Sequence, residues 1–211
     1  MYGLLIGIGI LASVLTAERL AKSREMNLEI FWGVVFWTLV LGIIGARAYH
    51  VLDYWEIYSA APISALFVWN GGLGIFGAIM AGLAAAVVFL RSRGEPLLPW
   101  LDIFLASLPL GQGIGRWGNY FNRELLPYSI YESAANLALF AFLFLIFKKH
   151  PKPGKITFLY FLGYGAIRFF LEPFRANYNP WQISGFNVAQ TISLILVFTA
   201  IMGLWKLKSA K

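Results

Sequence analysis

The sequence contains no cysteine, which excludes disulfide bonds, zinc–thiolate sites, iron–sulfur clusters and a cysteine nucleophile. Its two histidines, His50 and His150, are too few for a histidine-rich metal centre. Charged residues make up only 13% of the 211, against roughly 25% in soluble domains. Apolar residues are abundant instead, at 59%, and the mean hydropathy is +0.69. This composition argues against a soluble globular domain and for a polytopic membrane protein.

Seven apolar stretches approach the ~20 residues that a membrane-spanning helix needs. They cover residues 2–17, 31–52, 72–90, 99–115, 130–147, 156–171 and 188–204. The sequence holds no long linker, no low-complexity tract and no convincing internal repeat. We therefore predict an all-α, polytopic membrane protein, built as a seven-transmembrane-helix bundle with a single transmembrane domain over residues 1–211.

The basic residues predict the orientation of this bundle. Twelve of the 17 follow the first, third, fifth or seventh stretch, including all the lysines and the tail residues Lys206, Lys208 and Lys211. By the positive-inside rule this side is cytoplasmic, so the N-terminus lies outside and the C-terminus in the cytoplasm. The net charge of +7 then indicates topology and contact with anionic membrane lipid, and no nucleic-acid partner is predicted.

The remaining basic residues are all arginine and lie toward the outer ends of the second, fourth and sixth stretches. They are Arg47, Arg116, Arg123, Arg168 and Arg175, and the acids Glu124, Glu132 and Glu172 accompany them. A charged side chain at the middle of a spanning helix costs about 2.5–3.5 kcal/mol. Because planar guanidinium groups match phosphate oxygens, the set predicts a phosphate site. Structural ion pairs and arginines that extend to the membrane surface are the alternative.

Two segments combine glycine with polar residues. In residues 111–124, GQGIGRWGNYFNRE, the glycines permit either close helix packing or an unwound backbone that faces a ligand. The formal GxGxxG within it follows a membrane helix, so it does not indicate a dinucleotide site. In residues 70–82, NGGLGIFGAIMAG, a helix N-terminus could face an anion, with small-residue packing as the alternative.

A third polar pattern lies near the end of the sixth stretch, in GYGAIRFFLEPFR. Arg168 and Glu172 are four residues apart and therefore share one helix face, where the carboxylate can orient the guanidinium. Pro173 follows directly and should bend or end the helix. A simple pair within one helix is the alternative.

These residues in this order resemble the bacterial prolipoprotein diacylglyceryl transferase family. The matching pieces are YGLLIGIG, GARAYHVLDY, WNGGLGIFGA, LPLGQGIGRWGNYFNRE, YSIYE, GYGAIRFFLEPFR and VAQTIS. They run from the first stretch to the last, and GRxGNxxNxE is the most specific of them. Seven helices with the N-terminus outside are also what this family has.

The resemblance implies an enzyme of the bacterial cytoplasmic (inner) membrane. Such enzymes move the diacylglyceryl group of phosphatidylglycerol onto the thiol of a lipobox cysteine in the signal peptide of a prolipoprotein. The products are a thioether-linked prolipoprotein and glycerol 1-phosphate. The thiol belongs to the substrate, so the lack of cysteine here is no obstacle, and no metal or cofactor is implied.

The resemblance also implies roles for individual residues. The catalytic group comprises Arg116, Arg168, Glu124 and Glu172. The substrate-binding group comprises Asn119, Tyr2, Arg47, Gly71, Gly72, Gly118, Asn122, Tyr131 and Glu132.

The sequence departs from the family in two places. Phe76 stands where many members carry a histidine that has been considered as the base, and His50, Glu124 or Tyr131 are open alternatives for that role. Only residues 125–127 separate Glu124 from YSIYE, where members usually have a sizeable outer arm. Two other functions stay open at this point: a catalytically inactive relative that binds lipid, and an anion or lipid transporter.

Overall fold

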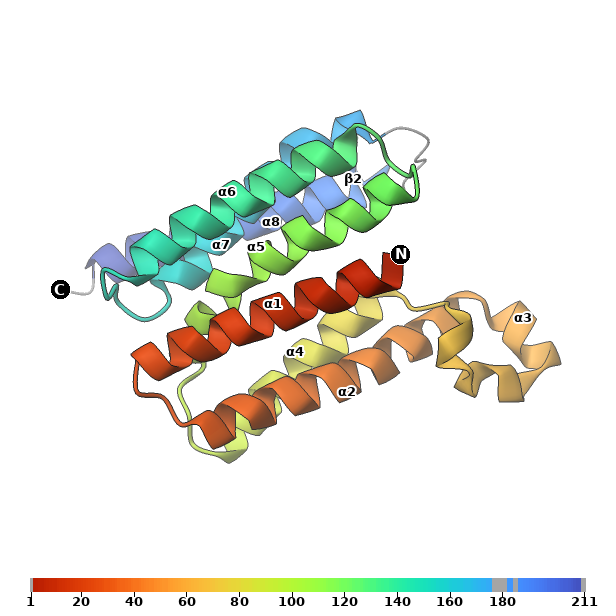
Figure 1. The fold of residues 1–211 in the computed structure, drawn as a ribbon, viewed down its shortest axis with the longest axis horizontal. Helices are drawn as coiled ribbons and strands as arrows, with labels where there is room; N and C mark the ends of the chain where they lie inside the picture. Colours follow the sequence, from red (N-terminus) through yellow and green to blue (C-terminus); the bar gives the residue numbers. More distant parts are fainter. Residues whose placement is uncertain (1, 176–181, 184–185, 210–211) are drawn as a thin grey trace. The chain divides into compact units, whose positions relative to one another are not determined.

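The computed structural model describes residues 2–175, 182–183 and 186–209, and it is almost entirely helical (Figure 1). The α-helices are α1 (Tyr2–Ser23), α2 (Leu28–Asp53), α3 (Trp55–Ala60), α4 (Ile75–Ser92), α5 (Leu97–Phe121), α6 (Tyr128–Phe147), α7 (Lys155–Leu171) and α8 (Val188–Ser209). Short 3-10 helices are η1 (Pro62–Leu66), η2 (Val68–Asn70) and η3 (Glu172–Phe174). Two-residue strands β1 (Gln182–Ile183) and β2 (Phe186–Asn187) pair antiparallel. Lys211 lies outside the described residues.

Each of the seven predicted apolar stretches is a helix in the structure. Six of them are long and apolar enough to cross a membrane, all except α7, which has 17 residues. Helices α1 and α5 extend well past their apolar runs, because hydropathy marks only the apolar part of a helix that continues through polar residues. Helix α7 ends at Leu171, just before the η3 turn that contains Pro173, as expected for proline. The seventh span and the orientation of the termini stay predictions.

The chain forms two compact units. The first comprises Met1–Leu20 and Leu98–Lys211, and therefore most of α1 together with α5, α6, α7 and α8. The second comprises Ala21–Leu97, with α2, α3 and α4. The prediction of a single transmembrane domain over residues 1–211, made from the sequence, stays a prediction.

In the second unit, small residues let α2 and α4 pack backbone against backbone. A Cβ atom built on Gly45 would lie 2.6 Å from the carbonyl oxygen of Gly77, which is too close for a larger residue. One turn away, Gly42 faces Gly82. Such close approach is how helices associate in a membrane, where no hydrophobic effect drives them together.

Helix α4 begins three residues later than predicted. The sequence predicts a helix that starts at residue 72. However, Gly71 and Gly72 have φ values of +85° and +73°, in the left-handed region that a right-handed helix cannot use. The chain turns there, and the helix starts at Ile75. The hydropathy of glycine does not distinguish a turn from a helix.

In the first unit, hydrogen bonds and close contacts connect α5 to its neighbouring helices. A Cβ atom on Gly9 of α1 would lie 2.8 Å from the carbonyl oxygen of Gly111, and Ser13 Oγ donates to the Ser107 carbonyl at 3.2 Å. Helix α5 continues without interruption to Phe121, so its glycines are helical and the alternative of an unwound backbone is wrong. Gly111, Gly113 and Gly118 approach neighbouring helices closely, whereas Gly115 faces open space. Helix α7 packs against both α6 and α8, which lie beside it in Figure 1.

A buried carboxylate connects α5 to the beginning of α7. The side chain of Asp102 accepts hydrogen bonds from the backbone N–H groups of Gly154 (2.7 Å) and Thr157 (2.8 Å), and from the Thr157 hydroxyl (2.7 Å). The first N–H groups of a helix have no partner within it, so a carboxylate from a neighbouring helix can cap them. Asp102 therefore fixes where α7 starts relative to α5.

Candidate active site

A polar stripe on α6 forms the base of the candidate site. It consists of Ser129, Glu132, Ser133 and Asn136, which are all buried and lie on one face of the helix. Ser133 Oγ donates to the Gly113 carbonyl of α5 at 2.8 Å, and Asn136 Nδ2 donates to the Glu132 carbonyl at 2.9 Å. The stripe therefore holds α6 against α5 and places the Glu132 carboxylate in the interior of the first unit.

Glu132 binds Arg116 through both of its carboxylate oxygens. Arg116 Nη2 donates to Oε1 at 2.8 Å, and Arg116 Nε lies 2.7 Å from Oε2. Both carboxylate oxygens thus lie within 2.8 Å of the Arg116 guanidinium, one through a hydrogen bond and the other through an ion pair. Glu132 was predicted to contact substrate, but in this structure its carboxylate contacts the guanidinium of Arg116.

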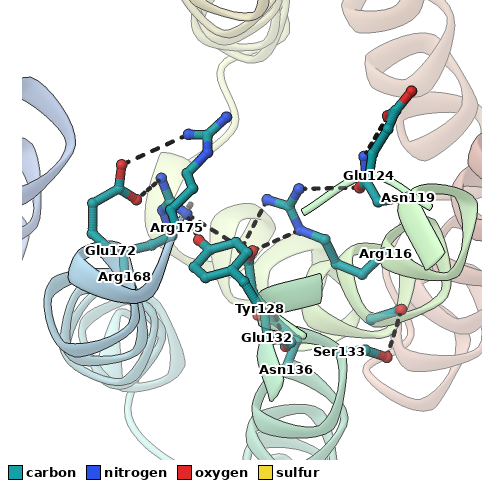
Figure 2. Close-up of polar contacts among 11 residues, drawn as sticks. Arg116, Asn119, Glu124, Tyr128, Glu132, Ser133, Asn136, Arg168, Glu172 and Arg175 are labelled. Atoms are coloured by element: carbon teal, nitrogen blue, oxygen red, sulfur yellow. Dashed lines mark hydrogen bonds and ion pairs between the residues drawn. The ribbon is translucent and has the colours of Figure 1, made fainter. Parts of the chain in front are cut away.

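Arg168 joins Glu132 to a second buried carboxylate (Figure 2). Its Nη2 lies 2.6 Å from Glu172 Oε2, and its Nη1 lies 3.7 Å from Glu132 Oε1. The same Nη1 donates to the hydroxyl of Tyr128, and Arg175 Nη1 lies 3.7 Å from Glu172 Oε1. The charged groups thus form one continuous network from the end of α5 across α6 to the end of α7. We call it the arginine network: Arg116, Arg168, Arg175, Glu132 and Glu172.

The GRxGNxxNxE motif lies at the end of α5, beside this network. Arg116 Nη1 donates to Asn119 Oδ1 at 3.4 Å, and Asn119 Nδ2 donates to Glu124 Oε2 at 3.2 Å. Asn122 Nδ2 donates to the other oxygen of Glu124 at 3.5 Å, and the Glu124 N–H donates to the Asn119 carbonyl at 2.8 Å. The motif therefore folds back on itself, with Asn119 buried and Glu124 exposed.

The accessibility of the arginine network differs between its cations and its anions. The side chains of Glu132 and Glu172 are 2% and 0% exposed, whereas those of Arg116, Arg168 and Arg175 are 27%, 13% and 26% exposed. The carboxylates thus lie behind the guanidinium groups, and three positive charges face two buried negative ones. An anion that approaches the network therefore meets guanidinium donors before it meets either of these carboxylates, an arrangement suited to a phosphate.

Two further predicted residues lie at this end of the first unit. The ring of Tyr2 packs on Gly118, where a Cβ atom would lie 2.7 Å from Tyr2 Cδ2. Gly118 immediately precedes Asn119, so the contact brings the phenol ring of α1 next to the motif. Tyr131 is exposed on α6, and its side chain has no polar contact among those the structure records for the described residues.

Three predicted substrate-binding residues lie in the second unit and contact one another. Arg47 is buried and donates from Nη1 to the carbonyls of Gly71 (2.6 Å) and Gly72 (3.0 Å). Its Nη2 and Nε donate to the carbonyls of Ser64 (2.7 Å) and Ala65 (2.8 Å). These contacts engage four of the five N–H groups of the guanidinium with backbone oxygens. Arg47 therefore holds the loop between α3 and α4 in place.

The candidate bases are divided between the two units. In the second unit, His50 packs against Gly72 and lies near the rings of Tyr54 and Tyr58, while Phe76 packs against Tyr49. In the first unit, Glu124 is hydrogen-bonded to two asparagine side chains. Among the described residues, no group of three or more histidine, aspartate or glutamate side chains is arranged to hold a metal ion.

Three members of the site are not among the candidate residues named from the sequence: Tyr128, Ser133 and Asn136. The signal was present in the spacing of residues 129, 132, 133 and 136, which is the repeat of a helix face within an apolar run. A polar stripe of that kind indicates a helix whose polar face is buried against protein.

The family described as Prolipoprotein diacylglyceryl transferase matches residues 1–206. The chain belongs to this family. Among the relatives that carry the name "Phosphatidylglycerol--prolipoprotein diacylglyceryl transferase", three illustrate the similarity. The protein of Finegoldia magna is 33% identical (95% of this chain and 88% of the relative), and that of Gloeobacter violaceus is 35% identical (97% and 87%). The protein of Prochlorococcus marinus strain MIT 9301 is 32% identical (98% and 88%).

Membership in the family, together with six long apolar helices, identifies the chain as a multi-pass membrane protein. The alignment with the Prochlorococcus relative spans 260 positions, more than the 211 residues of this chain. That relative therefore contains segments that this chain lacks. The family assignment inferred from the motifs is confirmed.

Proposed function

We propose that this chain transfers the diacylglyceryl group of phosphatidylglycerol to the cysteine thiol of a prolipoprotein lipobox, in the signal peptide. The observation that carries the proposal is the arginine network, in which partly exposed guanidinium groups cover two buried carboxylates. The shared family and the names of its relatives support the substrates. No metal or other cofactor enters the proposed reaction.

In the proposed reaction the thiol loses its proton, and the sulfur attacks the glyceryl carbon that is bonded to the phosphate oxygen. A C–S bond forms as the C–O bond breaks, and the electron pair leaves with the phosphate of glycerol 1-phosphate. The phosphate gains a negative charge during this step. Donors that are already positioned around it stabilise the transition state more than the ground state, which is the condition for catalysis.

Arg116 and Arg168 are the proposed phosphate contacts. Glu172 orients Arg168 through its 2.6 Å ion pair, and Glu132 does the same for Arg116. Asn119 is proposed to bind the lipid head group, with Asn122, Gly118 and Tyr2 shaping the surface around it. Glu124 is proposed either to orient Asn119 or to accept the thiol proton, because it is exposed and hydrogen-bonded to Asn119.

The remaining assignments rest on the resemblance. Tyr131 is proposed to contact substrate from the exposed face of α6. Arg47, Gly71 and Gly72 are proposed as substrate-binding residues through the loop that Arg47 holds. The base is proposed to be one of Glu124, His50 and Tyr131, since Phe76 cannot accept a proton.

We also propose the complete topology and location. Helix α7 is the seventh span, the N-terminus lies outside, and the C-terminus lies in the cytoplasm of a bacterium, with the chain in its inner membrane. The distribution of basic residues supports this orientation. In the first unit the lysines lie at one end of α6, α7 and α8, and the arginine network lies at the other end.

The test is reconstitution of the purified chain with phosphatidylglycerol and a lipobox peptide, read out as the mass of the peptide. The peptide should gain the mass of a diacylglyceryl group with the natural chain and not with Arg116→Ala. The thermal unfolding midpoint of Arg116→Ala shows whether the variant remains folded. Undiminished transfer by a folded Arg116→Ala variant would contradict the phosphate assignment. No transfer by the natural chain, with phosphatidylglycerol still bound, would indicate an inactive lipid-binding relative.

A further inference from the structure

The end of the first unit opposite the arginine network is rich in lysine. Helix α6 ends there, α7 begins there, and α8 ends there. Six lysines lie on these helix ends and in the α6–α7 connection: Lys148, Lys149, Lys152, Lys155, Lys206 and Lys208. All six are exposed. The positive-inside rule accounts for the side of the membrane on which these lysines lie, but not for their arrangement around one another.

Three of these lysines surround a hollow between the start of α7 and the end of α8. The hollow has a volume of about 460 Å³ and is lined by Lys152, Lys155, Leu204, Leu207 and Lys208. We call it the lysine hollow. Lys152 Nζ donates to the carbonyl oxygen of Leu207 at 3.4 Å, which joins the α6–α7 connection to α8. The lining is therefore amphipathic, since it combines three exposed lysines with two half-buried leucines.

The place of the hollow in the chain limits what can occupy it. Lys208 lies in the last turn of α8, a helix long and apolar enough to cross a membrane. Lysine side chains at such a helix end lie at the level of the lipid head groups. A ligand there meets positive charge on its polar side and leucine on its apolar side. A phospholipid with a net negative charge has both parts in this order, with its phosphate next to the beginning of its acyl chains.

We propose that the lysine hollow binds the phosphate of an anionic phospholipid in the leaflet at this end of the chain. In the proposed topology this is the cytoplasmic leaflet. Lysine suits the task because its ammonium group is a compact point charge that accepts phosphate in many orientations. Such a site would anchor the ends of α7 and α8 to the membrane surface, at the opposite end from the arginine network. The inference does not depend on the proposed transfer reaction.

The chain offers a matched control for this inference. Lys148, Lys149 and Lys206 lie on the same end of the first unit but do not line the hollow. Lys148 instead places its ammonium group over the ring of Phe144, 4.6 Å from the ring centre. Replacing either set of three by glutamine removes the same charge from the same end. The two triple variants should therefore differ in lipid binding only if the lysine hollow is a specific site.

The experiment measures association of spin-labelled phosphatidylserine with the full chain reconstituted in phosphatidylcholine vesicles at physiological salt. Phosphatidylserine carries a net negative charge, and it is not the proposed substrate. The triple variant K152Q/K155Q/K208Q should lower the association constant of the motionally restricted lipid at least about tenfold, and K148Q/K149Q/K206Q less than about twofold. Equal loss in both variants, or no loss in either, would overturn the proposal.

Two further measurements complete the test. Free glycerol phosphate is added in excess as a competitor, and it should not displace the labelled lipid. Displacement would mean that the hollow binds soluble phosphate compounds, which would overturn the assignment to lipid. If the hollow variant fails to fold, as judged by its thermal unfolding midpoint, the single substitution Lys208→Glu on the exposed last turn of α8 replaces it and should weaken association in the same direction.

Discussion

The two ends of the first unit hold their positive charges in different ways. At one end, Arg116, Arg168 and Arg175 are interlocked with two buried carboxylates over distances of 2.6 to 3.7 Å. At the other end, the lysines are exposed. Arginine presents five N–H donors in a rigid plane, so one guanidinium can bind a carboxylate and still offer donors to a ligand. Lysine is a flexible point charge, which suits a membrane surface.

The buried carboxylates repeat this contrast. Glu132 and Glu172 bind guanidinium groups, whereas Asp102 at the lysine-rich end binds backbone N–H groups and a hydroxyl. A carboxylate that binds a guanidinium orients a group able to act on a ligand. A carboxylate that binds a helix N-terminus fixes the position of a helix. The comparison therefore predicts that substitutions at the arginine network change transfer, and that substitutions at Asp102 change stability.

The largest effect is expected for Glu132→Gln. It leaves Arg116 and Arg168 facing a neutral amide in the interior, and breaking one side of a buried pair costs about 3–5 kcal/mol. Transfer should fall below detection, and the thermal unfolding midpoint of the purified protein should drop. Both quantities are measured on the same preparation in detergent.

The matched variant for stability is Glu124→Gln, because Glu124 is an exposed carboxylate at the same end of the chain. Its unfolding midpoint should stay close to that of the natural chain. If Glu132→Gln unfolds no more easily than Glu124→Gln, then Glu132 is not a structural part of the arginine network.

The next effect separates the shape of arginine from its charge. Arg168→Lys keeps the charge but loses the planar fork of donors that contacts Glu172 and Tyr128 from separate nitrogens. Losing one positioned donor to a developing negative charge typically lowers kcat about 10²–10³-fold, and we expect a loss of that size in steady-state transfer assays. The reciprocal exchange Lys148→Arg, at the lysine-rich end of α6, should leave transfer unchanged. Equal activities of the two variants would remove the distinction between the ends.

A smaller loss of transfer is expected for Tyr128→Phe. The hydroxyl accepts a hydrogen bond from Arg168, and Tyr128 is buried, so the phenylalanine ring fits the same space without this contact. Hydrogen bonds to charged groups contribute about 1.5–3 kcal/mol, and we expect kcat to fall about tenfold with little change in KM. Tyr120→Phe, on an exposed ring of α5, is the control. A change confined to KM would make Tyr128 a ligand contact instead.

Much of this comparison could be predicted from the sequence. Hydropathy located the seven apolar helices, though not the short helix α3, and the excess of arginine at one end and of lysine at the other follows from the order of basic residues. The helix ends could not be predicted, because Gly71 and Gly72 form a turn that hydropathy scores as helix. The ion-pair partners could not be predicted either, because pairing Arg116 with Glu132 requires knowing that α5 and α6 pack against each other along one face. The sequence did indicate Glu172 as the ion-pair partner of Arg168, because the two residues are four positions apart in the chain.

The smallest effect on transfer is expected for Asp102→Asn, and it tests the structural half of the comparison. The N–H groups of Gly154 and Thr157 bind different oxygens of Asp102, so asparagine turns its NH2 group, a donor, toward one of them, and that buried donor loses its partner. The cost is about 1–3 kcal/mol of stability, seen as a lower thermal unfolding midpoint. Transfer per folded molecule should be unchanged, because Asp102 contacts the beginning of α7 and Arg168 lies near its end, 11 residues further along the helix. A rise of about 1.5 Å per residue separates these points by roughly 16 Å. If transfer instead falls in parallel with stability, the start of α7 controls the position of Arg168, and the two ends act as one unit.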